Sequence, residues 1–344
     1  MPLTPPAPET TLMFREAAEA PAVVARVLEA NRPLTQALGA ELRANPPRAV
    51  VTCARGSSDH AATYAKYLIE TLTGVVTSSA ALSVSSVYAA EPKLDGVLYL
   101  AISQSGKSPD LLAAAEAAKQ AGALVVALVN DEASPLAALA DHVLPLHAGP
   151  ELSVAATKSY IAALTSIAQL VAAWSQDAAL EKALEDLPAI LRQAWPLDWS
   201  PVAERLQTAT NLYVLGRGVG FGIAQEAALK FKETCGLHAE AFSAAEVLHG
   251  PMALVQRGFP VLIFAQDDQS QASVLDLAQE LLARGVDVML AGEGPGALPT
   301  VRAHPNLEPI ARIQSFYRMA NTLSILRGHD PDKPPHLNKV TETI

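Results

Sequence analysis

Cysteine is scarce in this chain: Cys53 and Cys235 are the only two among 344 residues. They lack the paired spacing of a zinc site, and each lies inside an apolar segment. We therefore expect two buried thiols in a reducing compartment, and no metal centre.

Basic residues are also few. The 25 Lys and Arg residues are outnumbered by 35 Asp and Glu residues, which gives a formal charge of −10. Nucleic acids and anionic membranes require clustered Lys and Arg side chains, and the sequence has no such stripe. A small anion can still bind to loop amides and helix N-termini whatever the net charge. The composition therefore excludes nucleic-acid and membrane partners, but not a phosphate.

Several sequence patterns are missing as well. No apolar run approaches the roughly 20 residues that span a bilayer, and the start MPLTPPAPETT is unlike a signal peptide. We therefore expect a soluble, cytoplasmic protein. There is no GxxxxGK[ST] loop, and the third glycine of GRGVG (216–220) comes too early for the GxGxxG fingerprint. Neither a P-loop nucleotide site nor a dinucleotide cofactor is expected, and no cofactor of another kind is predicted.

What the chain does contain is a regular alternation of short apolar runs and longer helical patterns. Its length and its hydrophobic content of 50% are enough for two domains with large cores. The alternation predicts parallel βαβ units. Strands are expected at 49–54, 96–102, 123–129, 142–146, 211–215, 260–265 and 286–290, and helices at 59–72, 109–121, 156–175, 223–235, 271–284 and 310–327.

The two halves of the chain resemble each other. A first strand ends in CARGSS (53–58) in one half and in LGRGVG (215–220) in the other, and each is followed by a helix. We predict an α/β fold of two tandem doubly wound parallel sheets, similar to flavodoxin. The predicted domains are 1–195 (N-terminal helices and first sheet), 196–330 (second sheet) and 331–344 (a tail that closes the active site), with 195–200 as linker.

Serine-rich loops follow two of the predicted strands in the first half. Ser103, Gln104, Ser105 and Ser108 surround a glycine between a strand and a helix, where open parallel sheets bind ligands. Their hydroxyls and amides suit a phosphate dianion. One such loop could equally be a polar connection with an ordinary Ser N-cap. A second loop of this kind, with Gly56, Ser57 and Ser58, favours the phosphate.

A charged run lies on the predicted helix 223–235. Glu226, Lys230 and Glu233 fall on one helical face, which is usually a solvated surface. Here the flanks are apolar, and a turn-rich stretch with His238, Glu240, Glu246 and His249 follows. Carboxylates near lysine and histidine in apolar surroundings suit proton transfer at carbon.

Four motifs together resemble the SIS (sugar isomerase) domain family. They are SQSG (103–106), VAATK (154–158), the run 226–233 and EVLHGP (246–251). Over nearly the whole chain, the likeness is greatest to the isomerase half of glucosamine-6-phosphate synthases and to SIS-type glucosamine-6-phosphate deaminases. The resemblance implies a homodimer with shared active sites, a sugar phosphate as ligand and no cofactor.

The resemblance also implies residue roles. Glu233 would move a proton between C1 and C2 of the sugar, and His249 would open the ring, reaching the site from the neighbouring subunit. Lys339 would contact the open-chain sugar or form an imine with it. The residues expected to bind the substrate and its phosphate are Gly56, Ser57, Ser58, Ser103, Gln104, Ser105, Ser108, Val154 and Lys230.

The chain departs from the synthase pattern at Lys107, which stands where an acidic residue is common, and at Ala156, which replaces a Ser. Its start also lacks the Cys nucleophile of a glutaminase domain. We therefore expect the direction that releases ammonia, from glucosamine 6-phosphate to fructose 6-phosphate. The alternatives are a galactosamine-6-phosphate deaminase, a fructosamine-phosphate deglycase, a ketose/aldose isomerase, or a sensor of sugar phosphates without catalysis.

Overall fold

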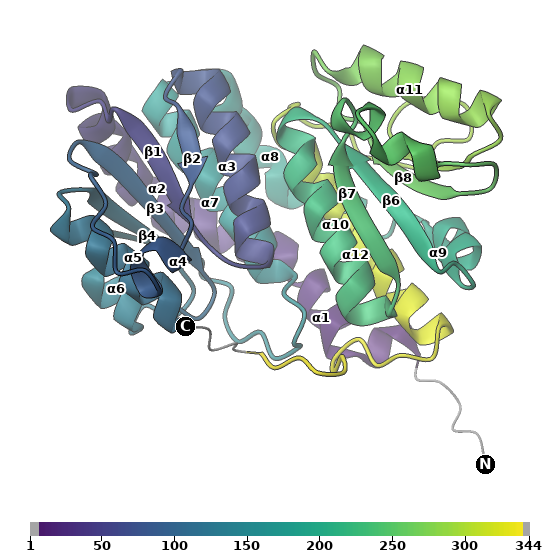
Figure 1. Ribbon diagram of the computed structural model, residues 1–344, viewed down its shortest axis with the longest axis horizontal. Coiled ribbons are helices and arrows are strands. Elements are labelled where there is room, and N and C mark those ends of the chain that lie inside the picture. The colour runs from purple at the N-terminus through teal and green to yellow at the C-terminus, as the bar shows by residue number, and fades with distance from the viewer. Residues whose placement is uncertain (1–6, 340–344) are drawn as a thin grey trace. The chain divides into compact units, whose positions relative to one another are not determined.

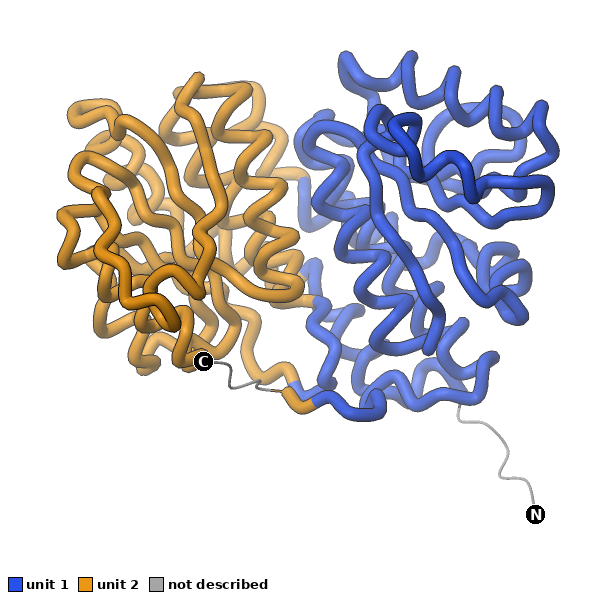
Figure 2. The backbone as a smooth tube through the Cα atoms, viewed as in Figure 1, with its two compact units in different colours: residues 1–21, 152–157, 187–337 blue, residues 22–151, 158–186, 338–344 orange. Residues whose placement is uncertain are grey.

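The computed structural model describes residues 7–339 (Figure 1). The chain divides into two compact units, coloured separately in Figure 2. We call residues 22–151, 158–186 and 338–344 the first-sheet unit, and residues 1–21, 152–157 and 187–337 the second-sheet unit. These units interleave along the chain, whereas the domain ranges expected from the sequence are contiguous; those ranges stay a prediction.

The first sheet has five parallel strands in the order β2-β1-β3-β4-β5, the flavodoxin-like order. Its central strand β3 is buried along its whole length. Because neither face at the centre of such a sheet meets water, β3 and its neighbour β4 consist almost entirely of apolar residues. The strands are β1 (Ala49–Cys53), β2 (Thr77–Ser79), β3 (Val97–Ser103), β4 (Leu124–Val129) and β5 (His142–Pro145).

Helices cover both faces of this sheet. Tyr99 and Ala101 of β3 pack with Leu111 and Ala115 of helix α5 in one core cluster. Successive side chains of a strand point to opposite faces, and α3 contacts β1 and β3 and also packs on α7. The helices are α2 (Ala20–Ala44), α3 (Ser57–Thr73), α4 (Ser83–Ser86), α5 (Pro109–Gln120), α6 (Pro135–Leu139), α7 (Lys158–Ser175) and α8 (Ala178–Ala194), with α2 and α8 crossing the unit boundaries.

The second sheet has four parallel strands in the order β7-β6-β8-β9. They are β6 (Asn211–Gly216), β7 (His238–Ser243), β8 (Pro260–Phe264) and β9 (Asp287–Ala291). Its unit contains the helices α1 (Leu12–Ala18), α9 (Ser200–Leu206), α10 (Phe221–Cys235), α11 (Gln271–Ala283) and α12 (Glu308–Leu326). Single turns occur at η1 (Pro8–Thr10), η2 (Gly218–Gly220), η3 (Glu246–Leu248) and η4 (Pro251–Leu254).

The two faces of the second sheet have different partners. Ile263 of β8 belongs to a core cluster with Val274 and Leu281 of α11. The next residue, Phe264, has its ring 6.3 Å from that of Phe316 on α12. Both units are therefore sheets covered by helices on two faces, which confirms the predicted fold class.

Most predicted elements are present. Strands β2 and β7 were not expected. The stretch after α10 was expected to be rich in turns, but 238–243 forms strand β7. His238 and Glu240 are exposed while Ala239 is buried, as is typical of a strand at a sheet edge. These polar residues interrupt the apolar pattern from which strands were predicted. Cys53 and Cys235 are buried, as predicted. No helix within 7–339 is both long enough and apolar enough to cross a membrane.

Candidate active site

The first sheet reverses its strand order between β1 and β3. From β1 the chain goes through α3 to β2 on one side, and from β3 it goes through α5 to β4 on the other. Cys53 and Ala101 are register partners at the ends of the β1–β3 ladder. The two serine-rich loops therefore leave the sheet at one topological switch point, where open α/β sheets bind ligands.

The loop after β3 is tightly folded around Gly106. The Gly106 amide donates to Ser103 Oγ at 3.0 Å, and the Lys107 amide donates to Ser105 Oγ at 3.4 Å. Gly106 has φ +63°, and a Cβ there would lie 2.7 Å from Cβ of Ser134. Only glycine fits this conformation and this contact. Because the hydroxyls of Ser103 and Ser105 accept these bonds, their hydrogens can still be donated to an anion.

Ser108 occupies the N-cap position of α5, yet among the described residues its side chain accepts no capping hydrogen bond. Ser108 is thus an N-cap by position, without the side-chain bond of an ordinary serine cap. Its hydroxyl lies at the positive end of a three-turn helix, which favours a negative group nearby.

The loop after β1 ends at Gly56, the N-cap residue of α3. Gly56 has φ +55°, and a Cβ there would meet no described atom within 4 Å. Its carbonyl accepts from the amides of Asp59 and His60, at 3.0 and 3.3 Å. Ser57 and Ser58 lie half-buried in the first helical turn. The space in front of Gly56 is thus open at the edge where the other serines lie.

An ion pair that the sequence analysis missed joins the two loops. Arg55 donates through Nε and a terminal nitrogen to Asp110 Oδ2, at 3.0 and 2.8 Å. The Asp110 side chain is fully buried, and its Oδ1 accepts from the Leu111 amide at 2.8 Å. The sequence offered one indication of this pair, because Arg55 directly precedes the first serine cluster and Asp110 closely follows the second. The pair ties the loop after β1 to the first turn of α5.

The charged face of α10 is buried, so the interpretation as a solvated surface is wrong. Lys230 Nζ lies 3.2 Å from Glu226 Oε1 and 2.5 Å from Glu233 Oε2. Tyr317 of α12 donates to Glu226 Oε1 at 3.0 Å. The side chains of Glu226 and Lys230 are fully buried, whereas that of Glu233 is 21% exposed. Glu233 is therefore the carboxylate through which this network meets solvent.

Burial by itself would lower the pKa of Lys230, but the carboxylates of Glu226 and Glu233 outweigh burial and raise it above the ordinary value. Lys230 therefore stays protonated and cannot act as a base. Its hydrogen bond holds Oε2 of Glu233. A direct contact of the buried Lys230 with substrate stays a prediction.

His249 lies in an exposed loop of the second-sheet unit, between η3 and η4. Leu248, the residue before it, and Leu254, at the end of η4, are 52% and 64% exposed. Val154, in the same unit, has its amide 3.4 Å from the carbonyl oxygen of Asp332 in the tail. In the first-sheet unit, Lys339 Nζ lies 3.2 Å from Glu151 Oε2.

The predicted site residues thus divide between the units. The first-sheet unit holds Gly56, Ser57, Ser58, Ser103, Gln104, Ser105, Ser108 and Lys339, and the second-sheet unit holds Val154, Lys230, Glu233 and His249. The roles of these residues in binding and catalysis stay predictions.

The switch point of the second sheet, between β6 and β8, is occupied by a glutamine side chain. Gln266 Nε2 donates to the Arg217 carbonyl at 2.6 Å and to Asp268 Oδ2 at 2.9 Å. A Cβ on Gly220 would lie 3.1 Å from Cδ of Gln266. The glutamine fills the crevice, and the carboxylates of Asp267 and Asp268 follow β8 at this edge. The loops 53–58 and 215–220 are similar in sequence, but only the first lies at an edge lined with serines.

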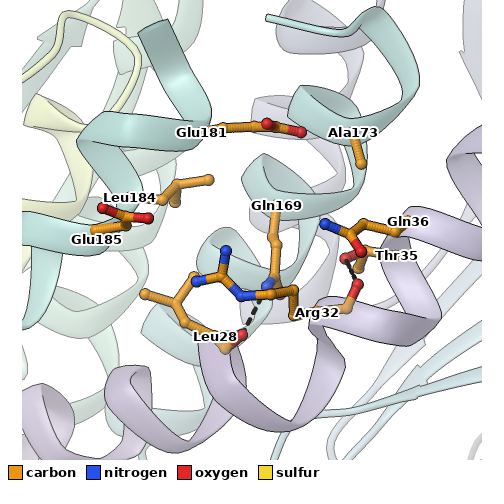
Figure 3. Close-up of a pocket in the computed structure, with 9 residues that line it drawn as sticks. All are labelled: Leu28, Arg32, Thr35, Gln36, Gln169, Ala173, Glu181, Leu184 and Glu185. Carbon is orange, nitrogen blue, oxygen red and sulfur yellow. Dashed lines mark hydrogen bonds between the residues drawn. The ribbon is translucent and has the colours of Figure 1, made fainter. Parts of the chain in front are cut away.

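Two cavities lie away from the serine-rich edge. One, of about 40 Å³, lies among α2, α7 and α8, where Gln169 donates to the Leu28 carbonyl at 2.8 Å (Figure 3). It has room for little more than water. The other, of about 480 Å³, is lined by Asn211, Pro260 and Asp287 at the amino ends of β6, β8 and β9, opposite the edge that binds ligands in such sheets.

Comparison with known proteins agrees with this fold. The family model described as the SIS domain matches residues 45–173 and 205–291. The chain belongs to the SIS domain family. As an SIS protein, it is 36% identical to the glutamine–fructose-6-phosphate aminotransferase [isomerizing] of Thermus thermophilus over 84% of this chain and 51% of that one. It thus spans about half the length of the curated relatives it matches.

Solved structures also resemble this SIS protein. A proposed phosphosugar isomerase from Silicibacter pomeroyi DSS-3 superposes with a TM-score of 0.89 at 45% identity, over 94% of this chain and 100% of that one. A glucosamine-6-phosphate deaminase from Thermotoga maritima has a TM-score of 0.79 at 23% identity, over 97% of this chain and 100% of that one. The second likeness concerns the fold alone.

Proposed function

We propose that this SIS protein is an isomerising deaminase that converts glucosamine 6-phosphate and water into fructose 6-phosphate and ammonia. The observation that carries the proposal is Glu233, a partly exposed carboxylate held by a buried Lys230. The relative from Thermus thermophilus is named for isomerising chemistry on fructose 6-phosphate, and the fold is shared with a protein named as the deaminase.

In this proposal the first-sheet unit binds the phosphate. Ser103 and Ser105 donate their hydroxyl hydrogens to it, together with the unused hydroxyl of Ser108. Charge-assisted hydrogen bonds to a dianion are stronger than those to a neutral sugar hydroxyl. A hexose 6-phosphate should therefore bind far better than the unphosphorylated hexose.

Glu233 then acts as the base. It takes the proton from C2 of the open-chain aldehyde and returns it to C1. The aldehyde oxygen gains a proton and the nitrogen loses one in the same isomerisation, so that the amine at C2 becomes an imine and C1 becomes an alcohol. Water adds to the imine carbon, the C–N bond breaks, and ammonia leaves together with fructose 6-phosphate. Protonated Lys230 orients Glu233 throughout. In the same proposal, His249 opens the sugar ring and Lys339 contacts the open-chain carbonyl.

Ammonia release from purified protein tests the proposal. Glucosamine 6-phosphate should yield ammonia and fructose 6-phosphate in equal amounts. Glu233→Gln should lower kcat by about 10²- to 10⁴-fold with little change in Kd for the sugar phosphate. Glu280→Gln, an exposed carboxylate on α11, is the control and should leave kcat unchanged. Absence of ammonia together with ketose–aldose exchange would show an isomerase without C–N cleavage.

The substrate panel should include galactosamine 6-phosphate and fructosamine phosphates. When a site forms a hydrogen bond to a sugar hydroxyl, it strongly disfavours substrates in which that hydroxyl is missing or inverted. Preference for galactosamine 6-phosphate or for a fructosamine phosphate would replace the proposed substrate while leaving Glu233 as the base. Binding without turnover of any member would indicate a sensor.

We further propose a homodimer in which His249 serves the partner's active site, because this histidine lies on an exposed loop between exposed leucines. Mixed dimers of Glu233→Gln and His249→Ala subunits test it. Shared sites predict recovery of activity on mixing, since each mixed dimer then contains one intact site. No recovery, with mixed dimers present, would place both residues in one subunit's site.

A further inference from the structure

Glu151 contacts the candidate catalytic lysine of the tail. Its Oε2 lies 3.2 Å from Nζ of Lys339, within the first-sheet unit. The Glu151 side chain is fully buried, and that of Lys339 is 25% exposed. The Lys339 amine therefore lies on the solvent side of the buried Glu151 carboxylate, where a ligand could reach it.

Glu151 is itself held in place by the start of α7. The Ser159 amide donates to Oε1 at 3.1 Å, and the Ser159 hydroxyl donates to Oε2 at 2.6 Å. A carboxylate that accepts bonds at a helix N-terminus is stabilised by the helix dipole as well. The hydrogen bonds from Ser159 therefore help to fix the orientation of Glu151 independently of Lys339.

Lys339, by contrast, lies near the end of the chain on a long flexible side chain. Ordering such a side chain costs about 2 kcal/mol of rotamer entropy. The tail is fixed upstream at Asp332, whose carboxylate accepts from the amides of Leu12 and Met13 at 2.7 and 2.8 Å. This anchor holds the backbone upstream of Lys339, and the contact with Glu151 acts on the amine itself.

We propose that Glu151 is a positioning residue that holds the amine of Lys339 ready for the open-chain carbonyl. The inference rests on the proposed function, since it needs Lys339 to act on the sugar. Glu151 contributes through the placement of that amine and has no contact of its own with the reacting carbons.

A double-mutant cycle tests this role. Glu151→Gln keeps an oxygen that can accept from Ser159 but removes the charge that attracts Lys339. It should lower kcat by about 10- to 100-fold, as misplacement of a reacting group does, with KM changed less than about three-fold. Lys339→Ala should lower kcat further. The double variant should match Lys339→Ala, because residues that act as a unit are not additive.

Two controls separate positioning from a general loss of structure. Asp141→Asn breaks an ion pair with Lys119 at the amino end of β5 and should leave kcat unchanged. Ser159→Ala keeps the charge of Glu151 but removes its shortest hydrogen bond, and should give a smaller loss. Multiplicative losses in the Glu151–Lys339 cycle, or a Glu151→Gln variant as active as the wild type, would overturn the proposal.

Limited acylation with acetic anhydride gives a readout independent of activity. An amine bonded to a carboxylate reacts more slowly than a free one, so the rate at Lys339 relative to exposed Lys93 should rise several-fold in Glu151→Gln. An unchanged ratio would overturn the proposed contact. If the ratio rises while the wild type turns over no sugar phosphate, the proposed function is wrong and the contact stands.

Discussion

Arg55 donates two hydrogen bonds to a single carboxylate oxygen of Asp110, at 3.0 and 2.8 Å. The arginine follows β1 and the aspartate lies in the first turn of α5, so one ion pair connects the two loops that carry the candidate phosphate serines. Asp110 is fully buried and Arg55 is about half exposed. The shape of the serine-rich edge therefore depends on a pair that need not touch the phosphate.

Arg55→Met should loosen this edge. It removes Arg55 as a cationic partner of the buried Asp110 carboxylate, which we expect to cost about 1–3 kcal/mol of stability. Kd for fructose 6-phosphate, measured by titration calorimetry, should rise about ten-fold because the two loops are no longer held together. Lys119→Met, which breaks a more exposed pair with Asp141, should change neither. A loss of stability with unchanged Kd would show that the pair does not shape the site.

Gly106→Ala should disrupt the serine loop. Alanine is strained at φ +63°, and its Cβ would also lie 2.7 Å from Cβ of Ser134 and 2.9 Å from Cγ2 of Val129. Gly74→Ala is a matched control, since φ is +73° but no described atom lies within 4 Å of the added Cβ. We expect Gly74→Ala to cost about 1 kcal/mol without affecting ligand binding. Gly106→Ala should cost more and weaken binding of hexose phosphates; equal effects would contradict the packing argument.

Lys230→Met should destabilise the protein strongly. It leaves Glu226 fully buried with the Tyr317 hydroxyl as a remaining partner, and breaking a buried pair by removing one member costs about 3–5 kcal/mol. Lys182→Met removes an exposed pair with Glu185 and should cost at most about 1 kcal/mol. Urea denaturation compares the two variants. Similar midpoints would mean that the α10 network is not the buried ion pair described above.

Alkaline pH should destabilise the fold through its cysteines. Burial raises the pKa of the Cys53 thiol to about 11 from an ordinary 9.0. Between about pH 9 and pH 11 the thiol of the unfolded chain ionises while that of the folded chain stays neutral. The free energy of unfolding is therefore unaffected by this thiol below about pH 9 and falls as the pH rises toward 11. The fall should be roughly 2–3 kcal/mol, measured by urea denaturation across that range. Cys53→Ala should show a flatter dependence.

The same burial should protect the thiols from modification. Burial also raises the pKa of the Cys235 thiol, to about 12. Both cysteine side chains are buried. Ellman's reagent at pH 8 should react with neither thiol in the folded protein and with both after unfolding in guanidinium. Rapid reaction of the folded protein would contradict the buried assignment.

The amino-acid sequence was sufficient to predict the α/β class, most strand and helix positions, the serine loops and the SIS relationship. These depend on local patterns: apolar runs of strand length, helical periodicity, and polar residues that follow a strand directly. Strand β7 escaped this reasoning because exposed His238 and Glu240 interrupt its apolar pattern.

Which charged residues are buried could be seen only in the folded chain. The helical face of Glu226, Lys230 and Glu233 has the same spacing whether it meets water or packs against Tyr317, which lies on a helix far along the chain. The folded chain likewise shows that Arg55 meets Asp110, that Gln266 fills the second crevice, and that Glu151 meets Lys339. Such contacts join residues distant in sequence, and strand order and helix packing, which no local pattern records, bring them together.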